Sequence, residues 1–211
     1  MILGIIPARA GSKGIPNKNI YPLCGKPLIQ YTINPVIHTI LEDIVISTDE
    51  LKLLFSTNTH WLTIQARPKE LALDNTPIIN VVNYVVKTYE KVNKNIYIDT
   101  VCILQPTSPL RTIVDIDTAI ELYRQSGADS LYSGYYMGIK HKEKTYDKHQ
   151  DKPHFQRNGA IFITRRDLLE KGLLWSDNVI EFEMPKSRSI DIDDMDDMFI
   201  AESLIKNGVL K

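Results

Sequence analysis

Two aspartates near the C-terminal end of the sequence have a spacing that suits metal binding. Asp191 and Asp193 alternate with Ile190 and Ile192. In an extended segment this alternation places both carboxylates on one face and directs both isoleucines into the core. Mg²⁺ in proteins is commonly held by one or two carboxylates together with substrate phosphates. By themselves, Asp191 and Asp193 fit a metal site and a structural role equally well. The acidic residues that follow suit the start of a helix: Asp194, Asp196 and Asp197.

A basic loop with two glycines follows the first apolar run of the chain. Within residues 7–19 it carries Arg9, Lys13 and Lys18. The glycines allow backbone amides to approach a ligand closely, the guanidinium forms a planar fork for phosphate oxygens, and the lysines add point charges. The loop matches neither GxxxxGK(S/T) nor GxGxxG, which argues against a P-loop NTPase and a dinucleotide-binding protein. The composition therefore indicates a triphosphate site, with a solvated surface loop as the alternative.

The composition is that of an ordinary folded protein without a strong overall charge. The 211 residues carry a formal net charge of -1, so no global attraction to nucleic acid or to a membrane surface is expected. Cys24 and Cys102 lie far apart and outside any CxxC pair, which disfavours a zinc site or a disulfide framework. The opening apolar run, residues 1–6, is too short for a secretory signal, and no run approaches the length of a membrane span. We expect a cytoplasmic protein.

Short β-branched runs alternate with longer amphipathic segments along most of the chain. The expected strands are 2–6, 44–47, 61–64, 100–104, 130–133, 160–164 and 179–182, and the expected helices are 27–39, 50–56, 76–91, about 110–125, 166–171 and about 194–206. This alternation predicts a three-layer α/β fold: a mainly parallel, twisted sheet with helices on both faces, formed by residues 1–211 as one domain. Ligands bind at the carboxyl ends of such strands, so the loops after Ile6, Ser47 and Leu104 are the expected site.

The basic loop resembles the signature loop of the CMP-acylneuraminate (sialic acid) synthetase family, which also activates related nonulosonic acids such as legionaminic acid. The similarity runs through Ile6–Gly14 and Pro16–Asn19 and continues in Gly25–Ile29. Five further segments occur in the family's order: Ile46–Asp49, Arg67–Ala72 with Asp74 and Thr76, Leu104–Arg111, Asn158–Ile163 and Ser189–Asp193. Each segment alone is a weak signal, whereas the six in order cover most of the chain and are specific.

This resemblance implies a Rossmann-like nucleotidyltransferase fold and a cytidylyltransferase activity. The enzyme would transfer CMP from CTP to the anomeric hydroxyl of an acidic nonulosonic-type sugar, such as a sialic or legionaminic acid, and release pyrophosphate. Matching positions assign Asp191 and Asp193 to Mg²⁺, with Mn²⁺ as a substitute, and Arg9, Lys13 and Lys18 join them as the expected catalytic residues. The implied nucleotide-binding residues are Ala8, Arg9, Gly11, Ser12, Lys13, Lys18, Asn19, Arg67 and Thr76, and the implied sugar-binding residues are Gln105, Thr107 and Asn158.

Several residues of these motifs also have a structural interpretation. Thr76 is the expected N-cap of its helix, with Pro77 just inside the helix start. Arg67 fits a surface ion pair as well as a nucleotide contact, and Gln105 fits a cap at a strand end. Arg111 fits an anion contact and a salt bridge near a helix start equally well.

The match is lost in a polar segment at about residues 135–157, which is shorter here than in the family and shows no clear periodicity. Sialic acid enzymes carry at this place an Arg- and Gln-rich stretch that helps bind the acceptor and build the dimer. A homodimer is still expected, but its architecture and the identity of the sugar stay open, with Lys140 and Arg157 as candidate partners of the sugar carboxylate. Ile78 and Ile79 replace small residues of the family, so the strictness of the selection for CTP is open too.

Three other functions fit parts of the pattern. A nucleotidyltransferase for a different acceptor, such as Kdo, pseudaminic acid or a sugar phosphate, is the nearest, although Gln105–Pro109 differs from the matching segment of Kdo synthetases. A glycosyltransferase with a DxD metal motif would use Asp191 and Asp193, but such enzymes carry the motif mid-chain and lack this basic loop. A non-catalytic nucleotide-binding module is the third. Nucleotidyl transfer releases pyrophosphate, whereas the glycosyltransferase releases a nucleotide and the module releases neither.

Overall fold

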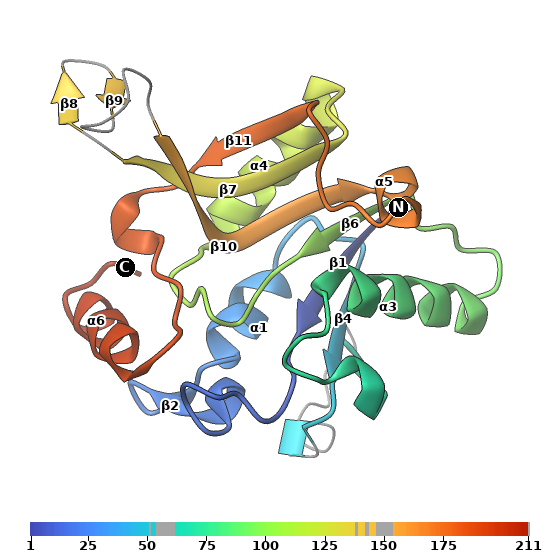
Figure 1. The fold of residues 1–211 in the computed structure, drawn as a ribbon, viewed down its shortest axis with the longest axis horizontal. Coiled ribbons are helices and arrows are strands. Elements are labelled where there is room, and N and C mark those ends of the chain that lie inside the picture. Colours follow the sequence, from blue (N-terminus) through green and yellow to red (C-terminus); the bar gives the residue numbers. More distant parts are fainter. Residues whose placement is uncertain (51, 54–61, 138, 142–143, 147–153, 211) are drawn as a thin grey trace.

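The computed structural model describes residues 1–210 except 51, 54–61, 138, 142–143 and 147–153. Its centre is a seven-stranded sheet in the order β11-β7-β10-β6-β1-β4-β5 (Figure 1). The strands are β1 (Ile2–Pro7), β4 (Asp43–Thr48), β5 (Thr63–Ala66), β6 (Thr100–Ile103), β7 (Ser130–Met137), β10 (His154–Arg165) and β11 (Val179–Glu183). Strand β10 runs antiparallel to β6 and β7, and the other neighbouring pairs of this sheet are parallel. The predicted mainly parallel sheet is confirmed.

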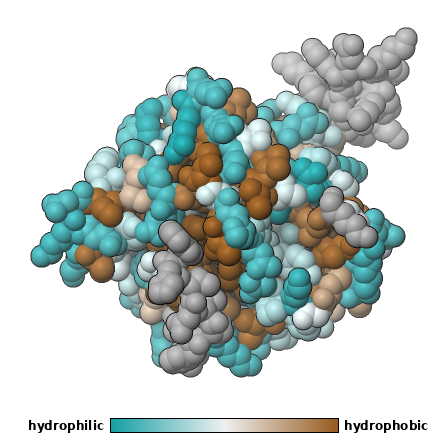
Figure 2. All heavy atoms as spheres, turned by 180° about the vertical axis from the view of Figure 1, so that it is seen from behind, coloured by the Kyte–Doolittle hydropathy of each residue, from teal (hydrophilic) through white to brown (hydrophobic). Residues whose placement is uncertain are grey.

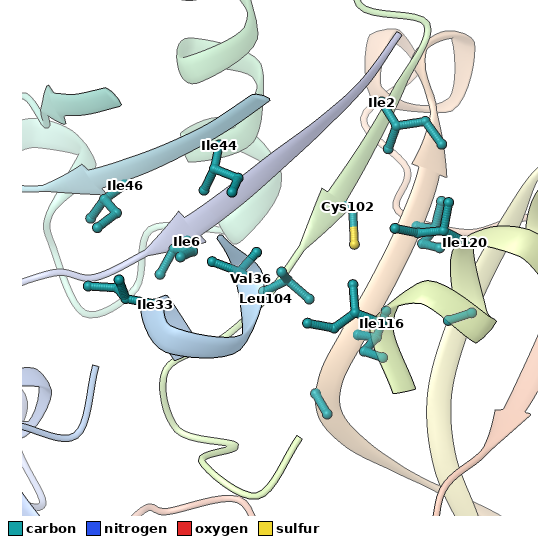
Figure 3. Close-up of a cluster of buried hydrophobic side chains, with 14 of the residues drawn as sticks. Ile2, Ile6, Ile33, Val36, Ile44, Ile46, Cys102, Leu104, Ile116 and Ile120 are labelled. Carbon is teal, nitrogen blue, oxygen red and sulfur yellow. The ribbon is translucent and has the colours of Figure 1, made fainter. Parts of the chain in front are cut away.

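Helices cover both faces of this sheet because the apolar stripe of each helix needs an apolar partner. On one face lie α1 (Gln30–Val36) and α4 (Ile113–Ser126), whose Val36 and Ile116 pack with Ile6 of β1 in the cluster of Figure 3. On the other face lie α3 (Ile78–Val92) and α5 (Arg166–Glu170), which pack through side chains such as Val85 and Leu169. The three-layer α/β architecture predicted from the sequence is therefore confirmed.

A third apolar cluster joins the two ends of the chain. The last helix, α6 (Met195–Lys206), lies beside a hairpin formed by β2 (Pro22–Leu23) and β3 (Lys26–Pro27) (Figure 1). The cluster contains Ile15, Leu23, Leu28, Ile192, Met198 and Ala201. Asp194 caps α6, since its carboxylate accepts hydrogen bonds from the backbone amides of Asp196 and Asp197. The basic loop and the aspartate segment are thus packed against one another.

The predicted starts of two helices are wrong. Pro27 pairs with Pro22 in the hairpin, whose turn uses positive φ angles at Cys24 and Gly25, so α1 begins only at Gln30. Pro77 immediately precedes α3, so the predicted N-cap role of Thr76 is wrong as well. Proline favours a helix start because its φ is already fixed near the helical value. Most of the helix predicted over 50–56 falls outside the described residues.

Strands β7 and β10 are longer than the segments 130–133 and 160–164 that the sequence indicates. They pair on both sides of a shift of register that lies between Arg157 and Phe162. Gly159 lies in this irregular stretch with a φ of 70°. The bulge interrupts the alternation of side chains within β10, so this strand does not appear in the sequence as one continuous pattern of period two. The polar segment at 135–157 therefore supplies the end of β7, the start of β10 and a hairpin of β8 (Ile139–His141) and β9 (Lys144–Tyr146).

Apolar side chains on the surface are spread over several elements. Figure 2 shows them on the back face of the molecule as patches among polar side chains. Over all faces of the described part of the molecule, the large apolar side chains that are more than half exposed are Leu73, Val92, Tyr97, Val114, Phe199 and Ile200. Single exposed apolar residues are normal on protein surfaces and by themselves indicate no binding site. Among the helices that the structure describes, none has the length and apolar character needed to cross a membrane.

Candidate active site

An open cleft with a volume of about 280 Å³ lies where β1 and β6 end. Four parts of the chain line it: the basic loop after β1, the segment after β5, the loop after β6 and the aspartate segment before α6. The predicted site residues on its wall are Arg9, Ser12, Lys18, Asn19, Arg67, Thr76, Gln105, Thr107, Asp191 and Asp193. The structure therefore brings together most of the residues that the motifs suggested, from the strand ends where the fold class places a ligand. The predicted site residues that do not line the cleft are Ala8, Gly11, Lys13 and Asn158.

The basic loop is fixed to the end of β4. The amide of Ala8 donates to the Ser47 carbonyl oxygen at 2.9 Å, and the carbonyl oxygen of Ala8 accepts from the Thr48 hydroxyl at 2.5 Å. The next contact is a hydrogen bond of 2.8 Å from the amide of Ala10 to the Asp49 carboxylate. Ala8 is fully buried. Its predicted contact with the nucleotide is not supported, because its backbone groups already hold the loop in place.

Two cations of the loop converge on one carboxylate at the cleft. Asp74 accepts from Arg9 at 2.7 Å and from Lys13 at 2.8 Å. The hydrogen bond from Lys13, with the charge of both cations, holds the pKa of Asp74 below its usual range. Asn19 supports the arrangement, since its amide donates to the Arg9 carbonyl oxygen at 2.8 Å. The two cations thus bind a carboxylate of the protein itself, and their contact with phosphate stays a prediction.

Lys18 lies between the basic loop and the aspartate segment. Its ammonium donates to the carbonyl oxygen of Ile192 at 2.6 Å and lies 3.5 Å from the Asp193 carboxylate. The amide of Ile192 donates in turn to the Thr107 carbonyl oxygen at 2.8 Å. The backbone of Ile192 is therefore held from two sides. A contact between Lys18 and phosphate stays a prediction, whereas its contact with this segment is part of the structure.

The aspartate segment shows the alternation that its spacing predicts. Ile192 is fully buried in the third cluster, whereas the Asp193 side chain is 85% exposed. Solvent reaches Asp191 through the cleft, but the protein atoms crowded around its carboxylate limit its hydration and raise its pKa. The charge of Asp193 adds to this rise, and a hydrogen bond from the side chain of Thr107 offsets part of it. The two carboxylates are close enough to repel, which a bound cation would relieve.

Asn158 is part of a buried polar network behind the cleft. It is 3% exposed, accepts from the Ser133 hydroxyl at 2.6 Å and donates to the Ser189 hydroxyl at 2.9 Å. The Ser108 hydroxyl donates to the backbone carbonyl oxygen of Asn158 at 3.1 Å. The predicted sugar contact of Asn158 is not supported, because burial and these bonds occupy its side chain. Instead, Asn158 ties β7, β10, the loop after β6 and the aspartate segment together.

Two arginines of the motifs are buried. Arg67 is 7% exposed and donates to the Ser47 carbonyl oxygen at 2.8 Å, so it is not the surface ion pair considered above. Burial lowers the pKa of Arg67 to about 10, despite the nearby charge of Asp49, and leaves it protonated at neutral pH. Arg111 is 1% exposed and makes no ion pair with the residues that the structure describes. It donates to the Gln105 carbonyl oxygen at 3.3 Å and so supports the loop after β6.

Known proteins share this combination of fold and sequence. A family profile described as cytidylyltransferase matches residues 3–188 of the chain. The chain belongs to this cytidylyltransferase family. A relative, the N-acylneuraminate cytidylyltransferase of Streptococcus agalactiae serotype III, is 31% identical over 92% of this chain and 50% of its own length. The CMP-N,N'-diacetyllegionaminic acid synthase of Legionella pneumophila is 30% identical over 97% of this chain and 96% of its own length. The chain thus spans about half of the first relative and nearly all of the second.

A solved structure shows that the fold is shared as well. The CMP:2-keto-3-deoxy-manno-octonic acid synthetase complexed with CTP has a TM-score of 0.73 to this chain and covers 98% of both chains, at 16% sequence identity. At this identity the likeness concerns the fold alone. It confirms the nucleotidyltransferase-type α/β fold expected for a member of the cytidylyltransferase family.

Several residues that build the site of this cytidylyltransferase family member were not assigned to it from the sequence. Asp49 and Asp74 belong to the motif segments but were given no role, and in the structure both hold the basic loop. The serines of the buried network gave a weaker signal, namely polar residues within or next to apolar runs: Ser108, Ser133 and Ser189. Arg157 lies over the ring of Trp175 at 4.4 Å, and a bond between it and a sugar carboxylate stays a prediction. The side chain of Lys140 lies outside the described part of the chain.

Proposed function

We propose that this chain transfers CMP from CTP to the anomeric hydroxyl of an acidic nonulosonic-type sugar and releases pyrophosphate. The observation that carries the proposal is the meeting of three groups in one cleft: Arg9 and Lys18 of the basic loop, the polar loop after β6 and the aspartate pair. Membership of the cytidylyltransferase family agrees with it. The relatives described above are named N-acylneuraminate cytidylyltransferase and CMP-N,N'-diacetyllegionaminic acid synthase, which favours this class of acceptor.

The cleft suits an in-line displacement at the α-phosphorus of CTP. Arg9 and Lys13 would hold the triphosphate and offset the charge of the departing pyrophosphate, and Gln105 and Thr107 would orient the sugar. The anomeric oxygen forms a bond to the α-phosphorus while the bond to the oxygen that bridges to the β-phosphorus breaks. The hydroxyl proton is released to solvent. The basic loop therefore needs a rigid position, which the contacts of Ala8 with β4 provide.

The aspartate pair fits a Mg²⁺ ion that substrate phosphates complete. No group of three or more His, Cys, Asp or Glu side chains within the described residues could hold a metal ion alone. Mg²⁺ commonly needs only one or two protein carboxylates beside phosphate oxygens and water, and Asp191 and Asp193 both face the cleft. Their mutual repulsion also favours a cation there. Bound Mg²⁺ would lower the pKa of the attacking hydroxyl and neutralise charge on the phosphate.

The cleft wall also supports the choice of a nucleotide. Leu71, Leu73, Ile78 and Val81 give one part of it an apolar surface, beside Arg67 and Thr76. A flat pyrimidine ring fits such a surface, with polar groups at its edge. We further propose that the protein forms a homodimer, as the family resemblance implies. We also propose that it lies in the cytoplasm, where reducing conditions suit its two separate cysteines. Light scattering on the purified protein tests the oligomeric state.

A pyrophosphate-release panel tests the function. CTP, UTP or ATP is combined with a sialic, legionaminic or pseudaminic acid, with Kdo or with a sugar phosphate, at saturating Mg²⁺ and in excess EDTA. We expect pyrophosphate and a CMP-sugar only from CTP with a nonulosonic acid, and only with the metal. Preference for UTP or ATP would refute the nucleotide assignment. Release of a nucleotide without pyrophosphate would indicate a glycosyltransferase, and undiminished turnover in EDTA would refute the metal role.

A further inference from the structure

Two glycines of the motif segments lie against the aspartate pair. A Cβ atom placed on Gly14 would lie 2.1 Å from the carbonyl oxygen of Asp193. A Cβ atom placed on Gly159 would lie 3.2 Å from a carboxylate oxygen of Asp191 and 2.8 Å from the amide oxygen of Gln105. Both distances to Gly159 concern side chains of the cleft wall. The side chains of Gln105 and Asp191 therefore fill the space next to Gly159, and the backbone of Asp193 fills the space next to Gly14.

The position of Gly159 in the sheet explains why these side chains come so close. It lies in the irregular stretch of β10 with a φ of 70°, and a Cβ atom built there would face Gln105 of the loop after β6 and Asp191 of the aspartate segment. Glycine adopts this conformation without strain, and its missing side chain allows Gln105 and Asp191 to approach one stretch of backbone together. The neighbouring Asn158 fixes that stretch through its buried bonds to Ser133 and Ser189.

The contact at Gly14 acts on the backbone of the same segment. A separation of 2.1 Å to a carbonyl oxygen leaves no room for a methyl group, so one of the two backbones would have to move. The segment cannot move freely, because Lys18 and Thr107 hold Ile192 from two sides. Gly14 thus determines how closely the basic loop approaches Asp193, and so the distance from the phosphate cations to the aspartate pair.

We infer that Gly14 and Gly159 are positioning residues for the aspartate pair, an inference that rests on the proposed function. Gly159 sets the carboxylate of Asp191 relative to the amide of Gln105, and Gly14 sets the backbone of Asp193 relative to the basic loop. At Gly159 the obstructing atoms are ends of side chains, which can rotate away. An added methyl group there would leave the fold intact and displace two groups that the reaction needs in place.

A matched pair of variants separates this role from backbone strain. Gly127 ends α4 with a φ of 68°, and no described atom lies within 4 Å of the position of its missing Cβ. Gly159→Ala and Gly127→Ala therefore carry the same left-handed strain, but only the first adds a clash with Asp191 and Gln105. Melting temperature, CTP affinity by calorimetry, turnover and Mn²⁺ binding by electron paramagnetic resonance are measured on both, and on Gly14→Ala as a second test.

We expect similar losses of melting temperature in Gly159→Ala and Gly127→Ala, and wild-type CTP affinity in both. A displacement of reacting groups by about 1 Å costs about 100-fold in rate, so kcat of Gly159→Ala should fall by about that factor. Mn²⁺ binding in the presence of CTP should weaken about 10- to 100-fold, as when groups that orient metal ligands are changed. Gly14→Ala should show the same two losses. Gly127→Ala should keep wild-type kcat and Mn²⁺ binding.

Equal kcat and equal Mn²⁺ binding in Gly159→Ala and Gly127→Ala would overturn the inference. The concentration of folded sites is taken from the CTP stoichiometry, so partial unfolding cannot imitate a fall in kcat. An inactive wild-type protein would refute the proposed function instead. In that case the Mn²⁺ comparison still decides the positioning role, because it requires no turnover.

Discussion

Replacing Lys18 by methionine tests whether this residue supports the aspartate segment or only binds phosphate. The Lys18 side chain is 11% exposed and donates to the Ile192 carbonyl oxygen at 2.6 Å. Methionine keeps the length of the apolar stem and removes the ammonium. The carbonyl oxygen then loses a charged donor in a partly buried place, while Ile192 keeps its hydrogen bond to Thr107.

The expected loss of stability follows from these contacts. A hydrogen bond to a charged group contributes about 1.5–3 kcal/mol. The ion pair with Asp193 adds little, because that carboxylate is 85% exposed and therefore screened by solvent. For a chain of this length, each kcal/mol shifts the melting temperature by about 2–4 °C. Lys18→Met should therefore melt about 3–12 °C below the wild type.

Lys13→Met is the matched control, because it makes the same substitution in the same loop. The Lys13 side chain is 80% exposed and contacts the carboxylate of Asp74 alone among the described charged groups. A surface change of this kind should move the melting temperature by at most about 2 °C while weakening CTP binding. Differential scanning calorimetry and CTP titrations on both variants provide the comparison. If Lys18→Met melts like the wild type and loses only CTP affinity, the structural link to Ile192 contributes no stability and the reasoning is wrong.

Four further predictions concern the charges of the cleft. Arg9→Ala should weaken CTP binding by about 10- to 150-fold in calorimetry with an unchanged melting temperature, and wild-type affinity would show that the phosphate site lies elsewhere. Asp74→Asn should tighten CTP and pyrophosphate binding, because Arg9 and Lys13 lose the carboxylate that competes with phosphate; weaker binding would mean that Asp74 orders the loop. Asp191→Asn and Asp193→Asn should each lower kcat far more than CTP affinity, since metal contacts strengthen in the transition state, whereas near-normal kcat at saturating Mg²⁺ contradicts the mechanism. Asp191→Asn should also melt above the wild type at pH 7. Crowding raises the pKa of Asp191 in the folded state, so the folded protein binds more protons than the unfolded chain. The wild type therefore loses stability as the pH rises from the unfolded pKa of 3.8 through the raised folded pKa, whereas the asparagine variant does not. This gain should vanish below pH 3.8, and a lower melting temperature at pH 7 would contradict it.

Two buried polar side chains illustrate what the sequence could not show. Arg111 was given an anion contact or a salt bridge, yet it is buried, supports the carbonyl oxygen of Gln105, and donates to Thr32 of α1 and Ala160 of β10. Asn158 was assigned to the sugar, yet its side chain bonds serines 25 and 31 positions away. Burial and bonding of a polar side chain depend on which distant segments pack around it. One sequence contains no local signal for that packing.

The layers of the fold and the kinds of side chain in the cleft could be predicted from the sequence alone. Apolar periodicity is a local property, so the alternation of strands and helices was legible, and residues at the ends of Ile2–Pro7 and Thr100–Ile103 could be expected to meet at one edge of the sheet. The contacts that hold those residues in place depend on the tertiary structure. The convergence of Arg9 and Lys13 on Asp74, and the approach of Gly159 to Asp191, join residues far apart in the chain. Such contacts arise when packed elements fix the distance between their loops, a quantity that the spacing of residues along the chain does not contain.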